Sequence, residues 1–203
     1  MIPAIVLAAG ASSRMGRPKA LLPIGPAGKA GETFLSRITH TLQEAGVEEI
    51  IIVLGNDAES VRAAMPGPDR SVRLIENTHP DQGQLSSLLV GLRAADRPGV
   101  RAVLVTLVDV PLVSADTVRT VLSTYKESKG ALIVRPARNG QHGHPVIFDR
   151  VLFQELRQAD PAIGARSVVH AHHADVVDVE VPDAGAFTDI DTPEAYARYI
   201  GNA

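Results

Sequence analysis

Residues able to bind phosphate follow directly after the first apolar run of the chain. Residues 2–9 are nearly all apolar, and the next ten positions contain two glycines, two serines, two arginines and a lysine. Glycine lets backbone N–H groups face an anion or a base edge, while hydroxyl and cationic side chains supply further donors. We therefore predict a polyphosphate-binding loop, with a solvated surface loop as the alternative. The predicted donors are Gly10, Ser12, Ser13, Arg14 and Lys19. The loop has neither the GxxxxGKS/T pattern of a P-loop nor the GxGxxG pattern of a dinucleotide site.

A second candidate is Asp109, which ends the most apolar run of the chain, residues 101–111. A carboxylate at the end of such a strand is costly to leave unpaired, and a divalent cation or a helix N-terminus would offset that cost. Asp109 is therefore a candidate metal ligand. The alternative is a turn residue, or a cap for a helix that begins near Ser114.

The third candidate is the pair Asp189 and Asp191 in the segment TDIDTP. Alternate residues of an extended chain point the same way, so both carboxylates could face one hard cation. Spacing does not decide which of the two is the ligand. The alternative makes them turn and capping residues for the last helix, whose expected N-cap is Thr192.

The histidines and serines carry weaker signals. Residues 142 and 144, and residues 170, 172 and 173, are histidines, but the chain has no cysteine and no HExxH spacing. We therefore expect ordinary loop or surface histidines, although His144 lies in a loop that could reach a ligand. No serine lies in a GxSxG elbow, so no Ser-His-Asp hydrolase is recognised.

The elements that must position these residues alternate between short apolar runs and amphipathic stretches. This alternation is typical of a parallel sheet covered on both faces, where ligands bind beyond the carboxyl ends of the strands. The expected strands are residues 2–9, 48–55, 72–77, 101–111, 131–137, 140–148 (after an entering loop) and 174–182. The expected helices are residues 34–46, 57–65, 84–95, 115–128, 151–158 and 192–200.

The predicted fold class is therefore α/β, a three-layer α/β/α arrangement with a mostly parallel mixed sheet. Residues 1–203 fit one domain, and no repeat or linker divides them. A formal net charge of -3 and seven aromatic residues argue against nucleic acid as a partner. The absence of cysteine and of a long apolar span favours a cytoplasmic protein that does not enter a membrane.

Several segments together resemble one family. LAAGASSRMGRPK (7–19) resembles the pattern L-A-A/G-G-x-S-x-R-M-G-x-x-K of nucleotidyltransferases, most closely the MobA-like molybdenum cofactor guanylyltransferase and cytidylyltransferase branch. NTHPDQGQLSSLLVGL (77–92), VDVP (108–111), GQHGHPVIF (140–148) and DIDTPEAY (189–196) are similar to further elements of that family. Val108 and Ala195 depart from the usual glycine and acidic residue.

The resemblance implies a Rossmann-like, glycosyltransferase-A-like fold and assigns roles to residues. It implies catalytic roles for Arg14, Lys19 and Asp109, with Mg²⁺ held by Asp109 and by Asp189 or Asp191. The implied nucleotide-binding residues are Leu7, Ala8, Ala9, Gly10, Ser12, Ser13, Arg14, Lys19, Asn77, Gln82, Gly83 and Ser86. The implied acceptor-binding residues are Ser87, Gly143, His144 and Pro145.

The implied reaction is attack of an acceptor phosphate on the α-phosphorus of an NTP, with loss of pyrophosphate. CTP is the favoured donor, because Ala9 and the aspartates near residue 190 are similar to the cytidylyltransferase branch. The implied acceptor is molybdopterin, with a sugar or alcohol phosphate as the alternative, and the implied protein partner is a recipient molybdoenzyme or its chaperone. We expect a monomer or a weak homo-oligomer. The alternative from another class is a non-catalytic maturation protein that binds a nucleotide or cofactor on the same fold.

Overall fold

The computed structural model describes residues 1–10, 14–24, 31–65 and 69–201. Eight strands form one mixed sheet in the order β3-β2-β1-β4-β7-β5-β6, with β8 paired to β5. The strands are β1 (Ala4–Ala8), β2 (Ile50–Leu54), β3 (Val72–Glu76), β4 (Ala102–Leu107), β5 (Ile133–Arg138), β6 (Gln141–His142), β7 (Val146–Asp149) and β8 (Val176–Glu180).

The sheet consists of two halves joined by one antiparallel pair. Strands β3, β2, β1 and β4 are parallel neighbours, so their carboxyl ends lie along one edge. Strand β7 runs antiparallel to β4, with Ala102 opposite Asp149 and Val105 opposite Val146. Beyond it lie β5, β6 and β8. The β4–β7 pair is therefore the join between the two halves.

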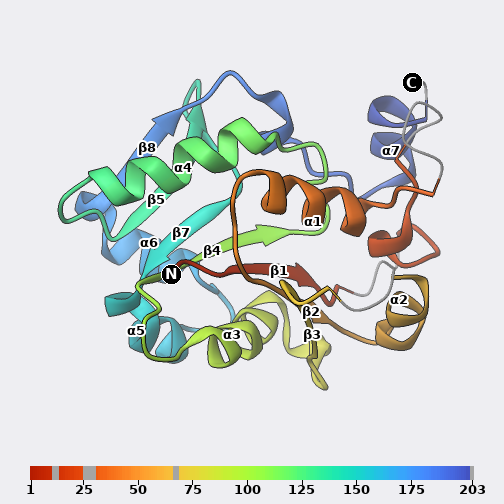
Figure 1. Cartoon of the computed structure of the whole chain (residues 1–203), viewed down its shortest axis with the longest axis horizontal. Coiled ribbons are helices and arrows are strands. Elements are labelled where there is room, and N and C mark those ends of the chain that lie inside the picture. The colour runs from red at the N-terminus through yellow and green to blue at the C-terminus, as the bar shows by residue number, and fades with distance from the viewer. Residues whose placement is uncertain (11–13, 25–30, 66–68, 202–203) are drawn as a thin grey trace.

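Helices cover both faces of this sheet (Figure 1). The helices are α1 (Phe34–Glu44), α2 (Ala58–Ala64), α3 (Gln84–Ala95), α4 (Ala115–Glu127), α5 (Phe153–Gln158), α6 (Arg166–Ala171) and α7 (Pro193–Tyr199). Apolar residues of α1, α2 and α4 pack in one core, and those of α3, α5 and α6 pack in the other. No helix in the described ranges is both long and apolar enough to cross a membrane.

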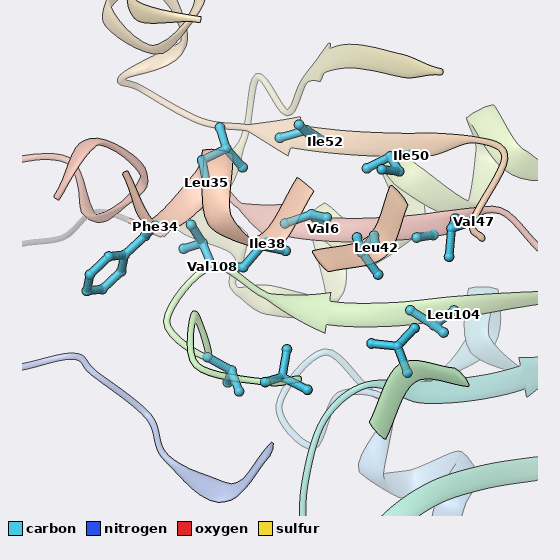
Figure 2. Packing of buried hydrophobic residues seen from close by; sticks show 14 of the residues in the cluster. Val6, Phe34, Leu35, Ile38, Leu42, Val47, Ile50, Ile52, Leu104 and Val108 are labelled. Carbon is cyan, nitrogen blue, oxygen red and sulfur yellow. The ribbon is translucent and has the colours of Figure 1, made fainter. Parts of the chain in front are cut away.

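The two cores follow from strict alternation along the strands. In β1, Ala4 and Val6 belong to the core under α1 and α4, while Ile5 and Leu7 belong to the core over α3. Successive side chains of a strand point to opposite faces, so a strand covered on both sides is apolar along nearly its whole length. Figure 2 shows the first core, with Ile38 and Leu42 of α1 against the strand residues.

Local signals define the ends of the helices. Thr33 and Ser36 form a capping box at the start of α1, and Gly46, with φ of 84°, follows its end. At the other end of the chain, the Thr192 side chain accepts a hydrogen bond from the Ala195 N–H and caps α7, as predicted. The Tyr196 ring of α7 stacks on Phe34 of α1 with centroids 6.1 Å apart.

The predicted three-layer, mostly parallel α/β fold is confirmed, and the elements lie within a few residues of their expected positions. Two features were not predicted. The run 140–148 contains two strands, β6 and β7, instead of one. Helix α6 was missed because only Val168 of its six residues is buried, which leaves no helical period of apolar residues.

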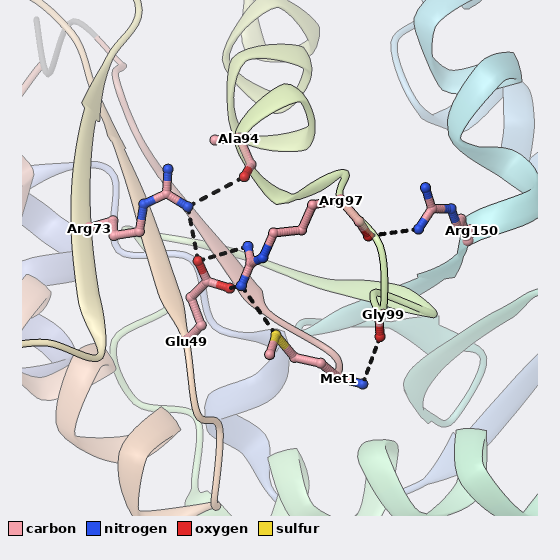
Figure 3. A network of polar contacts seen from close by, with 7 residues as sticks. All are labelled: Met1, Glu49, Arg73, Ala94, Arg97, Gly99 and Arg150. Carbon is pink, nitrogen blue, oxygen red and sulfur yellow. Dashed lines mark hydrogen bonds and ion pairs between the residues drawn. The ribbon is translucent and has the colours of Figure 1, made fainter.

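A polar network stabilises the edge of the sheet where the first strands begin (Figure 3). The buried Glu49 carboxylate accepts hydrogen bonds from Arg97 and from Arg73, the latter at 3.0 Å. Burial alone would raise the pKa of Glu49, but the bonds and charges of Arg97 and Arg73 outweigh it and hold the pKa below its usual value of 4.5. Arg150 donates to the Arg97 carbonyl at 2.8 Å, so the network also holds the segment before β4.

We expect Glu49→Gln to lower the free energy of unfolding at pH 7 by about 1–2 kcal/mol, because the charged acceptor of two guanidinium groups is lost. A carboxyl group with a depressed folded-state pKa contributes stability above its unfolded pKa and loses it as the pH falls through the folded value. The difference between the variant and the unchanged protein should therefore shrink below pH 4.5. Urea unfolding across this pH range measures it, with the exposed Glu59→Gln as control. A difference that does not depend on pH would contradict the role of the charge.

Candidate active site

The carboxylates of Asp109 and Asp189 are brought together where β4 ends. The Ile190 N–H donates to the Asp109 carbonyl at 2.7 Å, so the segment after β8 crosses the edge of the sheet directly beside the loop after β4. Asp189 precedes the donor residue in that bond, and the charge of Asp109 acts on its carboxyl group. Two acidic groups that are distant in the sequence thus lie close together at the edge where ligands bind in open α/β sheets.

Each predicted cation of the first loop is paired with one of the predicted carboxylates. Lys19 Nζ lies 3.2 Å from Asp109 Oδ2, and both side chains are mostly buried. Arg14 lies 2.8 Å from Asp191 Oδ2, with 66% of its side chain exposed. The loop after β1 therefore reaches both acidic segments. The two aspartates that the sequence left equivalent now differ, since Asp191 holds Arg14 while Asp189 lies beside Asp109.

The electrostatics around Asp189 fit a bound cation. Burial raises the pKa of Asp189, and the nearby charge of Asp109 raises it further, against the opposing effect of His144. Asp109 Oδ2 is bound to Lys19, but its Oδ1 is buried without a hydrogen-bond partner in the described part of the chain. A buried, unsatisfied carboxylate oxygen next to a second carboxylate is costly, and a divalent cation would satisfy both.

The site offers two carboxylates, and so small a number favours a metal ion that also binds phosphate oxygens of a substrate. Over residues 1–10, 14–24, 31–65 and 69–201, no three His, Asp or Glu side chains are placed to hold one ion. Magnesium is usually bound by one or two carboxylates together with waters and substrate phosphates, rather than by a cage of protein ligands. Asp109 and Asp189 fit this mode.

The end of β1 gives backbone access at the same edge. Leu7 and Ala8 are the last residues of the strand region, Ala9 is buried, and Gly10 is exposed. A Cβ on the neighbouring Gly55, after β2, would lie 2.5 Å from the Ala9 carbonyl oxygen, so only glycine permits this close approach. The predicted donors Ser12 and Ser13 lie outside the described residues.

Asn77 orders the loop between β3 and α3. Its buried amide donates to the hydroxyls of Ser86 and Ser87 at 2.8 and 3.0 Å, and its carbonyl oxygen accepts from the His79 N–H. The side chain of Asn77 thus forms these hydrogen bonds with the protein itself, so Asn77 is a positioning residue. The loop that it holds carries the exposed Gln82 and Gly83, whose predicted contact with the nucleotide stays a prediction.

A cavity of about 790 Å³ opens beside the carboxylates. Its floor is the face of the sheet that carries α3, α5 and α6, and Asp189 and His144 lie in its wall. Strand and helix residues of the floor and walls are mostly apolar: Leu7, Leu85, Leu88, Val105, Leu107, Val146 and Phe148. A cavity of this size, in the range of about 300–1,000 Å³, suits a ring-containing ligand.

Of the predicted acceptor-binding residues, Gly143 and His144 line the cavity. A Cβ on Gly143 would lie 2.2 Å from the Ala186 carbonyl oxygen, so glycine is required where β6 meets the segment after β8. Burial lowers the pKa of His144, and its Nδ1 has no hydrogen-bond partner among the described residues. Pro145 is buried, and Ser87 is buried against Asn77 instead of lining the cavity.

The structure also decides between interpretations that the sequence left open. The start of α4 is capped by Ser114, whose N–H donates to Asp183 at 2.8 Å, so Asp109 is not the cap of this helix. Thr192, and not Asp191, caps α7. Sequence reasoning missed Asp183, which follows β8 and ties that segment to α4. Its only sequence signal is an acidic residue after a strand-like run.

The comparison with protein families now decides the identity of the chain. The family model described as the MobA-like NTP transferase domain matches residues 4–176. The chain belongs to this MobA-like family. The predicted resemblance and the nucleotidyltransferase class are thereby confirmed.

Relatives and solved structures agree with the family. A probable molybdenum cofactor guanylyltransferase of Mycobacterium avium is 30% identical over 98% of this chain and 94% of its own length. The crystal structure of Rv0371c from Mycobacterium tuberculosis superposes with a TM-score of 0.82 and 30% identity, covering 98% of this chain and 97% of that one. Rv0371c was also solved as a complex with manganese, with a TM-score of 0.74 at 29% identity and coverage of 100% and 99%.

Not every relative is named as a guanylyltransferase. Nicotine blue oxidoreductase of Paenarthrobacter nicotinovorans is 29% identical over 97% of this chain and 95% of its own length. A probable guanylyltransferase of Rhodopirellula baltica is matched over 64% of its length, at 29% identity over 70% of this chain. Membership of the MobA-like family therefore gives the fold and the class of this protein, while substrates have to be argued from the site.

We expect Asp109→Asn to abolish binding of Mn²⁺ and metal-dependent release of pyrophosphate, because the carboxylate with the unsatisfied oxygen is lost while its shape is kept. Electron paramagnetic resonance of Mn²⁺ and a pyrophosphate assay measure the two effects. The matched control is Asp116→Asn on α4, whose side chain is 90% exposed. Near-normal turnover of Asp109→Asn would show that Asp109 holds no metal.

We expect Lys19→Ala to cost about 2–4 kcal/mol of transition-state stabilisation, the scale for the loss of one preorganised donor in a closed site. The measurement is kcat/KM for the nucleotide, compared with the exposed Lys129→Ala. If Lys19→Ala changed only the thermal stability, the loop after β1 would be a surface loop and not a phosphate site.

Proposed function

We propose that this MobA-like protein transfers a nucleoside monophosphate from an NTP to the phosphate of molybdopterin and releases pyrophosphate. The observation that carries the proposal is the meeting of Lys19, Asp109 and Asp189 at one edge of the sheet, between the loop after β1 and the cavity. Phosphoryl transfer of this kind needs positioning and neutralisation of charge more than a covalent nucleophile.

The division of the sheet into two halves supports separate binding sites for the two substrates. Residues 7–10 form the end of β1 and the start of the loop after it, and the loop held by Asn77 follows β3; these segments of the parallel half bind the donor nucleotide. The cavity lies mainly over β4, β7 and β5, and it takes the acceptor. Asp109 and Asp189 stand between the two, where the acceptor phosphate meets the α-phosphate of the donor.

The cations of the first loop act on the triphosphate. Lys19 neutralises the charge that develops on the departing pyrophosphate, and Arg14 holds the exposed side of the phosphates. An oxygen of the acceptor phosphate forms the new bond to the α-phosphorus, and the bond from that phosphorus to the bridging oxygen of pyrophosphate breaks.

A divalent cation, Mg²⁺ or Mn²⁺, would be held by Asp109 and Asp189, and when bound it neutralises phosphate oxygens on both substrates. Asp191 is then not a ligand but the partner of Arg14, which it orients. This assignment rests on the pair of carboxylates described above and on the unsatisfied Asp109 oxygen.

For the donor, we place GTP before CTP. Ala9 and the aspartates at 189 and 191 favour CTP by their resemblance to the cytidylyltransferase branch. Against it, the relatives at 30–31% identity over nearly the whole chain are named as probable guanylyltransferases. The cytidylyltransferases among the solved structures share only 18–21% identity, which supports the fold alone.

A panel of nucleotides tests the proposal. Purified protein is incubated with molybdopterin, Mg²⁺ and GTP, CTP, ATP or UTP, and pyrophosphate is measured with and without the acceptor. We expect pyrophosphate with GTP, only when molybdopterin is present, and none from Asp109→Asn. Mass spectrometry of the product identifies the attached nucleotide.

Other outcomes of the panel separate the alternatives. Pyrophosphate with CTP alone would reverse the assignment of the donor and restore the first expectation. Nucleotide binding without pyrophosphate from molybdopterin or from a sugar or alcohol phosphate would indicate a non-catalytic maturation protein.

A further inference from the structure

The lining of the cavity also carries arginine side chains that the nucleotidyl-transfer reaction does not use. Besides Asp189, the lining contains no carboxylate among the described residues, whereas it includes Arg135, Arg166, His142 and His170. These side chains come from β5, β6 and α6, while Asp189 lies in the segment after β8. A ligand in this cavity therefore meets the Asp189 carboxylate at the reacting end and cationic or polar donors elsewhere.

Two of these donors are already engaged by the protein. Arg135 Nε donates to Asp178 at 2.6 Å, and His142 Nε2 lies 3.2 Å from the same carboxylate. Arg166, by contrast, forms no side-chain hydrogen bond or ion pair within the part of the chain that the structure describes. Its guanidinium group is thus available, and such a planar group suits bidentate recognition of carbonyl or anionic oxygens.

The loop before α6 holds an apolar side chain over the same cavity. Asp160 organises the loop, because its carbonyl accepts from the N–H groups of Ile163 and Gly164 and its carboxylate from the Ala162 N–H. Ile163 is nevertheless 55% exposed and lines the cavity. A structured loop that presents an exposed apolar side chain to a cavity gives a flat ring a surface to pack on.

We propose that Arg166 and Ile163 select the acceptor: they recognise a phosphate ester of a fused heterocyclic ring that bears carbonyl or anionic oxygen at its end remote from the phosphate. The ring lies on the apolar floor, Ile163 covers it, and Arg166 binds the remote oxygen. This rests on the proposed function, because that function places the acceptor phosphate at Asp109 and Asp189. Small alcohol phosphates lack the ring and would leave these contacts unmade.

The test measures binding of neopterin monophosphate, a fused heterocycle with a phosphate ester, by its intrinsic fluorescence polarisation. We expect Arg166→Ala to weaken this binding about tenfold or more, the scale for a lost hydrogen bond to a charged group. Ile163→Ala should weaken it severalfold. The matched control is Arg93→Ala on α3, an exposed arginine outside the cavity lining, which should bind as the unchanged protein does.

Further arms separate this inference from the proposed function. Glycerol 3-phosphate should compete weakly with neopterin monophosphate, and Arg166→Ala should not change the inhibition constant of glycerol 3-phosphate. The affinity of the protein for GTP in the presence of Mg²⁺ is measured in parallel, and it should not change in Arg166→Ala or Ile163→Ala. The inference would be overturned, while nucleotide transfer stands, if Arg166→Ala and the unchanged protein bound neopterin monophosphate with equal affinity. It would also be overturned if GTP displaced neopterin monophosphate competitively. Absence of GTP and CTP binding in the unchanged protein would instead refute the proposed function.

Discussion

The antiparallel pairing of β4 with β7 is the interaction on which the arrangement of the site depends. It joins a parallel half, whose strand ends carry the loop after β1 and Asp109, to a half that supplies most of the cavity. Four residue pairs from Ala102–Asp149 to Val105–Val146 set its register. Because a slip of one residue would turn every side chain of β7 to the other face, this register also fixes which residues form the cavity floor.

Hydrogen bonds from the segment after β8 reinforce that join from outside the sheet. Ile190 binds the backbone at Asp109, and Asp183 binds the first turn of α4. The close approaches that allow this need glycine, since a Cβ on Gly185 would lie 2.0 Å from the Leu112 carbonyl oxygen. Rigid strands thus hold Asp109, while a segment fastened at several points brings Asp189 to it. Preorganised charge at the edge of a sheet is the result.

The fold and the motifs could be predicted from the sequence because both are local signals. A run as apolar as residues 102–108 indicates a strand covered on both faces, and the charged residues of the loop after β1 are read directly from the sequence. That residues 1–203 form one domain stays a prediction. Which aspartate lies beside Asp109 could not be predicted, because that depends on a hydrogen bond between segments far apart in the chain.

The cavity was beyond sequence reasoning for a similar reason. Its lining combines short segments, such as residues 161–166, whose composition carries no periodicity. The side chains of this segment form a cavity wall only because the fold brings them beside β7 and α3.

Asn77 shows the opposite case. The motif assigns it to the nucleotide site, which stays a prediction, and its hydrogen bonds go to Ser86, Ser87 and His79, so it positions the loop instead of serving as a free donor.

The return of residues 183–191 across the edge of the sheet has a consequence for the synthesis of the protein. The strands from β1 to β7 are complete once the ribosome has passed residue 149, yet the second carboxylate of the Asp109–Asp189 pair arrives only with residue 189. A nascent chain can therefore build most of its sheet before it holds the paired charges. Translation that stops between β7 and Ile190 yields a chain with the loop after β1 and Asp109 but without Asp189 beside them.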